Sequence, residues 1–113
     1  MTNTITREEL RDAIEAGEVT VVEALPAGYY EDAHLPGAIN IPHTEVRELA
    51  PALLPDKDAA IVTYCASTSC RNSEIAAIVL TKLGYANVRE YVEGKQDWRD
   101  AGLPLERAAP IAV

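Results

Sequence analysis

The sequence predicts an α/β fold in which a mostly parallel central sheet carries helices on both faces. Short apolar runs alternate along the chain with segments whose apolar residues recur every three or four positions, a pattern typical of strands alternating with helices. Glycine and proline separate these segments, and no repeat or low-complexity stretch interrupts the alternation. Because parallel strands are joined by crossover connections, the intervening helices should cover both sides of the sheet.

The N-terminal segment is expected to fold as a helix followed by a strand. Thr6 to Glu9 fits a capping box, in which the Thr6 side chain accepts from the Glu9 backbone and the Glu9 side chain reaches back to Thr6. The helix should end at Gly17, because glycine readily adopts the left-handed conformation of a helix C-cap. Residues 19–25 form a valine-rich run that predicts a strand.

The next elements are shorter. A helical turn is expected at 29–32 and a short strand at 38–41. Residues 44–54 have the pattern of a helix, and Pro51 should break or end its regular part. The reason is that proline lacks an amide hydrogen and its ring clashes with the preceding turn.

The second half of the chain continues the alternation. Residues 59–64 are a short, partly β-branched run that predicts a buried strand. Residues 72–83 carry apolar side chains every four positions, which predicts a helix, and Gly84 supplies its C-cap. The remaining expected elements are a strand at 88–92 and a short helix around 96–99.

Length and composition point to one globular domain. The chain has 113 residues, of which 48% are hydrophobic, so it can bury a single core. We expect one domain over 1–113, with a core from about 6 to 106 and a loose, alanine-rich tail at 107–113. No run approaches the length of a membrane span, and no secretory signal is indicated, so we expect a cytoplasmic protein.

The charge balance narrows the class of partner. The net charge is −8, and the lysines and arginines are scattered, which argues against nucleic acid or an anionic membrane surface as the partner. An acidic protein also repels anionic substrates at long range. Any anion site must therefore depend on local dipoles and on a nearby cation such as Arg71.

Cys65 is the strongest candidate for a reactive residue. It follows the buried strand directly and precedes a short loop of small and polar residues, after which a helix begins near Asn72. Such a loop can turn its backbone N–H groups inward, and the helix start adds partial positive charge. We therefore expect the pKa of the Cys65 thiol to be lowered, so that its thiolate acts as a nucleophile on an anionic group. In parallel sheets, ligands bind beyond the carboxyl ends of the strands, where Cys65 should lie.

The loop after Cys65 supplies the candidate binding residues. The Arg71 guanidinium offers two parallel donors to an oxyanion. Cys70 is either a resolving cysteine that forms a disulfide with Cys65, or a small residue that packs under the loop. The cysteine and histidine spacing does not fit zinc, so we expect no metal. The candidate binding residues are Ala66, Ser67, Thr68, Ser69, Cys70 and Arg71.

Four stretches of the chain together resemble the single-domain rhodanese family of sulfurtransferases. The resemblance spans about Thr6 to Glu106 and implies a rhodanese-like fold without a cofactor. It also implies that Cys65 carries sulfane sulfur as a persulfide from thiosulfate or a persulfide donor to a thiol or cyanide. The partners would be small anionic sulfur compounds and a thiol acceptor, which is a small molecule or a protein. The four stretches are His34 to Pro42, the strand–Cys65–helix unit, Leu83-Gly84-Tyr85 with Val88, and the set Gly94, Trp98, Gly102 and Pro104.

Departures from the family pattern leave alternatives open. Residues 23–25 read Glu-Ala-Leu where family members usually have Asp-Val-Arg, and Lys95 replaces the second glycine of a pair. The loop is one residue longer than usual, so that Arg71 follows Cys65 in a Cys-x5-Arg spacing. This spacing resembles that of cysteine-based phosphatases and arsenate reductases, some of them on the same fold. A further alternative is a non-catalytic redox or sulfide sensor that uses Cys65 and Cys70.

Overall fold

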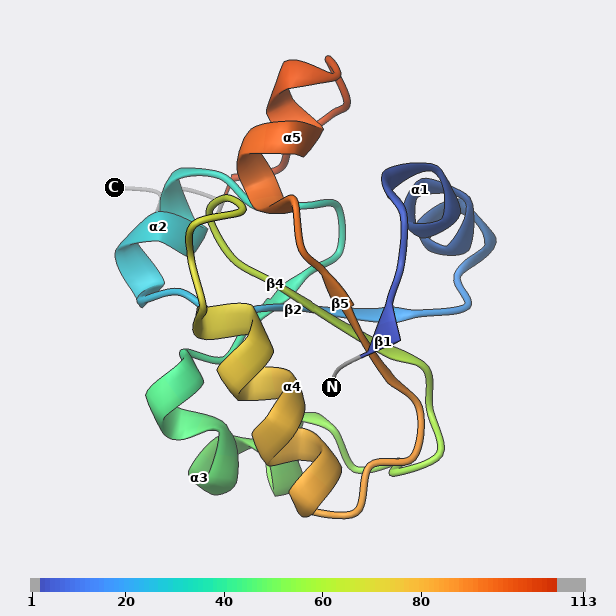
Figure 1. The fold of residues 1–113 in the computed structure, drawn as a ribbon, viewed down its shortest axis with the longest axis vertical. Coiled ribbons are helices and arrows are strands. Elements are labelled where there is room, and N and C mark those ends of the chain that lie inside the picture. The colour runs from blue at the N-terminus through green and yellow to red at the C-terminus, as the bar shows by residue number, and fades with distance from the viewer. Residues whose placement is uncertain (1–2, 108–113) are drawn as a thin grey trace, which may run out of the picture.

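The computed structural model describes residues 3–107 and shows a parallel sheet between two layers of helices (Figure 1). Five strands lie in the order β1-β5-β4-β2-β3, and all of these pairings are parallel. The predicted α/β class with a mostly parallel sheet is therefore confirmed. The strands are β1 (Asn3–Thr4), β2 (Thr20–Glu23), β3 (Ile39–Asn40), β4 (Ile61–Tyr64) and β5 (Val88–Tyr91). The helices are α1 (Arg7–Ala16), α2 (Ala27–Asp32), α3 (Val46–Leu53), α4 (Asn72–Lys82) and α5 (Gly94–Asp100), and the 3-10 turn η1 (His43–Glu45) precedes α3.

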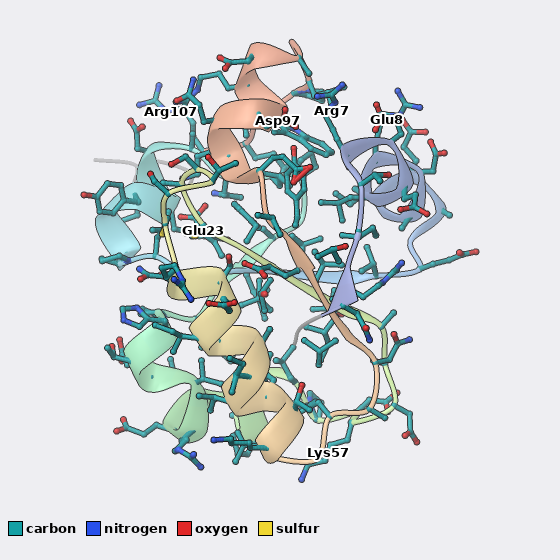
Figure 2. All side chains as sticks on the ribbon, in the orientation of Figure 1. Arg7, Glu8, Glu23, Lys57, Asp97 and Arg107 are labelled. Atoms are coloured by element: carbon teal, nitrogen blue, oxygen red, sulfur yellow. The ribbon has the colours of Figure 1, made fainter. Side chains whose placement is uncertain are left out.

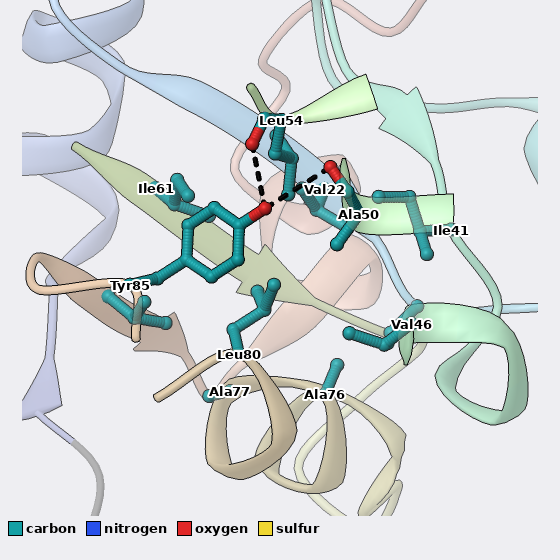
Figure 3. Close-up of a cluster of buried hydrophobic side chains, with 12 residues drawn as sticks. Val22, Ile41, Val46, Ala50, Leu54, Ile61, Ala76, Ala77, Leu80 and Tyr85 are labelled. Carbon is teal, nitrogen blue, oxygen red and sulfur yellow. Dashed lines mark hydrogen bonds between the residues drawn. The ribbon is translucent and has the colours of Figure 1, made fainter. Parts of the chain in front are cut away.

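One core layer lies between the sheet and helices α3 and α4 (Figure 3). It contains Val22 of β2 and Ile61 of β4, together with apolar side chains from both helices. The hydroxyl of Tyr85 lies in this layer and donates to the backbone carbonyl oxygens of Ala50 and Leu54, at 3.2 and 2.7 Å. The segment after α4 is thereby joined to α3, and the buried phenol has its hydrogen-bond partners.

The second core layer lies between the sheet and helices α1 and α5. Leu10 of α1 and Trp98 of α5 are buried there against Val21 of β2 and Val62 of β4. Val21 and its neighbour Val22 belong to opposite layers, because successive side chains of a strand point to opposite faces. This alternation decides which residues can meet at the carboxyl edge of the sheet.

The predicted start and end of α1 are confirmed. Thr6 Oγ1 accepts from the backbone of Glu9 at 3.1 Å, and the backbone of Thr6 donates to Glu9 Oε1 at 3.0 Å, which completes the capping box. Gly17 caps the other end with φ = 69°, a left-handed conformation in which glycine is not strained. Local sequence signals therefore suffice to place this helix.

Two features of the fold differ from the sequence prediction. The prediction that Pro51 breaks its helix is wrong, because α3 continues to Leu53 and the backbone of Leu54 donates to Ala50 at 2.7 Å. Pro51 removes one amide donor and is exposed, so its ring displaces no core side chain. β1, which pairs with β5, was not predicted, because two polar residues give no strand pattern.

The segment before residue 107 is attached to the body of the protein. His34 and Glu106 form an antiparallel bridge in which each backbone N–H donates to the other's carbonyl oxygen at 2.8 Å. Residues 108–113 of the predicted loose tail lie outside the described residues. Among residues 3–107, no helix has the length and apolar character needed to cross a membrane.

Candidate functional site

Cys65 lies directly after β4, at the carboxyl edge of the sheet and next to the first turn of α5. The backbone N–H of Lys95 donates to the carbonyl oxygen of Cys65 at 2.9 Å, and that of Gln96 donates to Ala66 at 2.9 Å. Figure 1 shows the loop between β4 and α4 beside the start of α5. The sequence placed the loop between a strand and one helix, whereas in the structure a second helix also holds it.

Gly94 makes this close approach possible. Its φ is +71°, and a Cβ atom at this position would lie 2.6 Å from the carbonyl oxygen of Cys65 and 2.9 Å from the nitrogen of Ser67. Both are backbone atoms, which cannot rotate aside as a flexible side chain would. The start of α5 can therefore dock on the loop only if residue 94 lacks a side chain.

The sulfur of Cys65 is buried, and its single S–H hydrogen has two acceptor oxygen atoms within hydrogen-bond distance. Sγ lies 3.4 Å from the carbonyl oxygen of Cys70 and 3.3 Å from Oγ of Ser73, a residue in the first turn of α4. Burial raises the pKa of the Cys65 thiol, and Cys70 adds to this rise. The side chain and the backbone of Ser73 lower the pKa of the thiol, as expected at a helix start. Their effect is smaller than that of burial and Cys70, so the pKa of Cys65 is raised overall.

The prediction of a lowered thiol pKa for Cys65 is therefore wrong for this structure. The sequence pattern indicates a loop and a helix start, but it does not indicate which way each peptide group of the loop points. Here the carbonyl group of Cys70 accepts from the thiol, and a carbonyl oxygen stabilises the protonated form of the sulfur. The side chain also has no access to water, which removes the solvation that a thiolate needs.

Arg71 is directed toward Glu74. Its Nε and Nη2 atoms donate to Glu74 Oε1 at 2.9 and 2.5 Å, and its side chain is 77% exposed. Two of its donors are thus occupied by a carboxylate on the first turn of α4. The role of Arg71 as an oxyanion clamp stays a prediction, and this pairing gives no support to the phosphatase or arsenate reductase alternative.

The other predicted loop residues differ in their exposure to solvent. Thr68 and Ser69 are exposed, while Ala66, Ser67 and Cys70 are half-buried. Cys70 is a free thiol, so its role as a resolving cysteine also stays a prediction. The structure places the loop on one side of a surface groove, whose lining includes Thr68, Cys70, Arg71 and Glu90 of β5. Residues 3–107 contain no group of three or more His, Cys, Asp or Glu side chains that could hold a metal ion.

A buried ion pair lies on the α5 side of the loop and was missed by the sequence analysis. Glu23, which is labelled in Figure 2, lies at the end of β2 and is fully buried. Its Oε1 lies 2.9 Å from Nζ of Lys95. The hydroxyl of Tyr64 donates to the same oxygen at 2.6 Å, and Lys95 also donates to the carbonyl oxygen of Tyr29 at 3.0 Å. A charge in such an environment is tolerated only when it is paired and hydrogen-bonded.

This ion pair joins two places where the sequence departs from the rhodanese pattern. Leu25 stands where that pattern has an arginine, and Lys95 stands where it has a glycine. One departure removes a cation near the end of β2, and the other supplies a cation that reaches Glu23. The sequence signal that points to this pair is a lysine in place of the family's glycine at 95, together with the loss of the family's arginine at 25.

Asp97 holds α5 to the rest of the molecule. Its two carboxylate oxygens accept from Arg7 Nη1 of α1 at 3.0 and 3.1 Å, and Figure 2 shows the two residues facing each other. The hydroxyl of Tyr91 of β5 donates to Asp97 Oδ2. The helix whose first turn supports the Cys65 loop is thus itself held by α1 and β5.

Comparison with known proteins gives a consistent family. The sequence pattern of the Rhodanese-like domain matches residues 6–101 of this chain. The chain is 40% identical over 107 residues to an HTH-type transcriptional regulator of Mycobacterium tuberculosis, a match that covers 95% of this chain and 46% of the regulator. It is 35% identical over 75 residues to the thiosulfate sulfurtransferase PspE of Escherichia coli, with 66% of each chain covered. The chain thus spans about half of the first of these relatives and about two thirds of the second.

A solved structure supports the same grouping. The crystal structure of a Bacillus halodurans protein superposes on this chain with a TM-score of 0.86 and 29% sequence identity. The match covers 94% of this chain and 77% of that chain. The arrangement of strands and helices described above is therefore shared over nearly the whole of this chain.

We expect Gly94→Ala to displace the Cys65 loop. Gly102→Ala is the matched control, because both glycines have a positive φ, 71° and 75°, but a Cβ atom at 102 would meet nothing within 4 Å. Gly94→Ala should lower the free energy of unfolding by about 1–3 kcal/mol more than Gly102→Ala, as overpacking against backbone does. Urea unfolding measures both values. Equal losses would contradict the docking role of Gly94.

We expect Lys95→Met to destabilise the protein strongly, by about 3–5 kcal/mol in urea unfolding, because it leaves the Glu23 carboxylate buried without its cation. The exposed Lys82→Met serves as the control and should change stability little. The double variant Glu23→Gln/Lys95→Met should be more stable than Lys95→Met alone, since it removes the unpaired charge. Glu23→Gln is also measured alone. If the stability losses of Glu23→Gln and Lys95→Met simply add in the double variant, the ion pair is not the reason for the effect.

Proposed function

The chain belongs to the rhodanese-like domain family, and we propose that it is a sulfurtransferase that carries sulfane sulfur as a persulfide on Cys65. The observation that carries this proposal is the position of Cys65, between the end of β4 and the first turn of α4, with Ser73 against its sulfur. A relative named thiosulfate sulfurtransferase, 35% identical to this chain, supports the choice of reaction. The proposal includes a cytoplasmic location, where reducing conditions keep Cys65 and Cys70 as thiols.

In the first half-reaction, Cys65 takes up a sulfur atom. Its thiolate attacks the sulfane sulfur of thiosulfate, a new S–S bond forms, and the old S–S bond breaks with its electron pair leaving on sulfite. A persulfide donor reacts in the same way and leaves as a thiolate. The product is an anionic persulfide on Cys65, formed without a metal or organic cofactor.

In the second half-reaction, the acceptor removes the outer sulfur. An acceptor thiolate, or cyanide, attacks the terminal sulfur of the persulfide, and the S–S bond to Cys65 breaks with its electron pair returning to Sγ. The acceptor leaves as a persulfide or as thiocyanate, and Cys65 is again a thiolate. Each half-reaction moves a sulfane sulfur atom from one nucleophile to another, so the cycle needs no external oxidant or reductant.

The surroundings of Cys65 support an anion on its sulfur only through Ser73 and the start of α4. The hydroxyl and backbone of Ser73 both favour the thiolate, and the dipole of α4 acts in the same sense. The carbonyl oxygen of Cys70 opposes it, because it accepts from the thiol. The proposal therefore includes a change of the 66–71 loop on donor binding, in which the peptide group of Cys70 turns away from the sulfur.

A second candidate function is a sulfide or redox sensor. It is favoured by the free thiol of Cys70 in the same loop and by the 40% identity to a protein named as a transcriptional regulator. In this function an oxidant would convert Cys65 to a sulfenic acid, and Cys70 would displace water from it to form a disulfide. Negligible sulfur transfer from any donor, together with a reversible disulfide that Cys70→Ser abolishes, would favour the sensor.

The sulfurtransferase proposal predicts a sulfur adduct on one cysteine only. After incubation with thiosulfate, mass spectrometry of digested peptides should find about 32 Da added to Cys65, and a thiol acceptor should remove it. Cys70 in the same peptide is the internal control. Cys65→Ser, which retains Cys70, should lose transfer to cyanide completely. Turnover by Cys65→Ser equal to that of the wild type would rule out the proposal.

A further inference from the structure

We infer that Glu90 is a positioning residue that holds the hydroxyl hydrogen of Ser73 away from the Cys65 sulfur, and thereby keeps the thiol protonated in the resting protein. This inference rests on the proposed function only in taking Cys65 as the nucleophile. Glu90 does not touch the sulfur and acts through Ser73. The three side chains come from the end of β4, the first turn of α4 and β5.

Ser73 has a single hydroxyl hydrogen, and Glu90 accepts it. Oγ of Ser73 lies 2.7 Å from Oε2 of Glu90, and a carboxylate can only accept. The sulfur of Cys65 lies 3.3 Å from the same Oγ. Because the one hydrogen of Ser73 is directed at the carboxylate, this hydroxyl turns only its lone pairs toward the sulfur. In this arrangement Ser73 is an acceptor for the thiol and not a donor to a thiolate.

The carbonyl group of Cys70 acts on the sulfur in the same way. Its oxygen lies 3.4 Å from Sγ of Cys65, and it has no hydrogen to donate. The S–H hydrogen can therefore bond to either of two oxygen atoms, whereas a thiolate would face the lone pairs of both in a buried site. The raised pKa of the Cys65 thiol, caused first by burial, agrees with these surroundings. The side chain of Ser73 favours the thiolate only when its hydrogen turns from Glu90 to the sulfur.

The sheet register and a second hydrogen bond fix Ser73 beside Glu90. Thr63 of β4 is paired in register with Glu90 of β5, and its hydroxyl donates to the carbonyl oxygen of Ser73 at 2.9 Å. Ser73 is fully buried and Glu90 is 5% exposed, so water does not compete for the hydroxyl hydrogen. The turn of α4 that carries Ser73 is thus held at its carbonyl group by Thr63 and at its side chain by Glu90.

Glu90 also lines the surface groove described above, where other charges surround it. The positive charge of Arg71 interacts with Glu90, and Thr4, its partner in β1, does not titrate. Lys95, at the start of α5, is paired with Glu23 instead. These groups are unchanged in the variants below, so the effect of residue 90 on the thiol is measured against a constant background. The titratable side chains that share the groove with Glu90 are Cys70, Arg71 and Glu74.

This arrangement protects the resting thiol and can be released without breaking a covalent bond. Alkylating agents and oxidants attack the thiolate, so a sulfur that is kept protonated reacts slowly with them. Rotation about the Cβ–Oγ bond of Ser73 is enough to bring its hydrogen to the sulfur. A negative charge that develops on Cys65 attracts this hydrogen more strongly than a neutral thiol does. Ser73 therefore becomes a donor as the thiolate or persulfide forms, and Glu90 sets how readily this happens.

The test begins with Glu90→Gln, which keeps the shape of the side chain but replaces the charged acceptor with a neutral amide. The amide holds the Ser73 hydrogen less strongly. Alkylation of Cys65 by iodoacetamide, a neutral reagent, is measured as a function of pH, and mass spectrometry of digested peptides counts Cys65 and Cys70 separately. The midpoint of the profile should move to lower pH in Glu90→Gln. The rate at about pH 7 should rise about threefold to tenfold, the range expected for one hydrogen bond.

The same substitution in a Ser73→Ala background separates action through Ser73 from direct repulsion. Repulsion between the carboxylate and the thiolate does not need the hydroxyl, so it would make Glu90→Gln speed alkylation equally in both backgrounds. If Glu90 acts through Ser73, Glu90→Gln should speed alkylation in the wild type and change it by less than about twofold in Ser73→Ala. An equal rise in both backgrounds, or no rise in the wild type, would overturn the inference.

Thr63→Val is the matched control for a loosened structure. It removes a buried hydrogen bond to the carbonyl oxygen of Ser73 and leaves the hydroxyl of Ser73 with Glu90. A loosened loop admits the reagent more often and raises the rate at every pH, whereas release of the Ser73 hydrogen moves the midpoint of the profile. Thr63→Val should therefore lower stability in urea and leave the alkylation midpoint unchanged. A midpoint shift as large as that of Glu90→Gln would contradict the inference.

The outcome is separate from that of the proposed function, because alkylation requires no sulfur donor. A gain in Glu90→Gln that depends on Ser73 supports the inference even if thiosulfate leaves no adduct on Cys65. Conversely, an adduct on Cys65 together with equal gains in both backgrounds supports sulfur transfer and rejects the role of Glu90.

Discussion

The docking of α5 on the Cys65 loop is the contact on which the arrangement of the site depends. Two backbone hydrogen bonds from the first turn of α5 hold the carbonyl groups of Cys65 and Ala66, and Gly94 leaves the space for them. The same turn carries Lys95, whose ammonium group neutralises buried Glu23. Hydrogen bonds from Arg7 and Tyr91 to Asp97 keep this helix in place, so the loop is supported from outside its own sequence.

Two buried polar clusters lie beneath this loop, one on each side of the sheet. Glu23, Tyr64 and Lys95 occupy the α5 side, while Ser73 and Glu90 occupy the α4 side. The first cluster is an ion pair with its charges matched, and such pairs fix geometry more than they add stability. The second joins the hydroxyl of Ser73, which lies against the Cys65 sulfur, to the carboxylate of Glu90 at 2.7 Å. The first cluster therefore lies against the first turn of α5, which supports the loop, and the second lies against the thiol.

Local signals in the sequence predicted more of the fold than of the site. The capping box at Thr6, the glycine at 17 and the position of Cys65 after a buried strand all follow from near-neighbour patterns, and the structure contains them. The thiol pKa could not be predicted, because it depends on burial and on the direction of one peptide group. The link from Ser73 to Glu90 joins residues 17 positions apart, and only the sheet register brings them together.

The shortness of the outermost strands has a consequence beyond the site. Within residues 3–107, the sheet ends in β1 on one side and β3 on the other, and each of these strands has two residues. A border this short offers few free amide and carbonyl groups, so foreign strands gain little by adding to it. Such a unit resists edge-to-edge aggregation, and its contacts with any neighbouring domain or molecule should be made through side chains on its helices and loops.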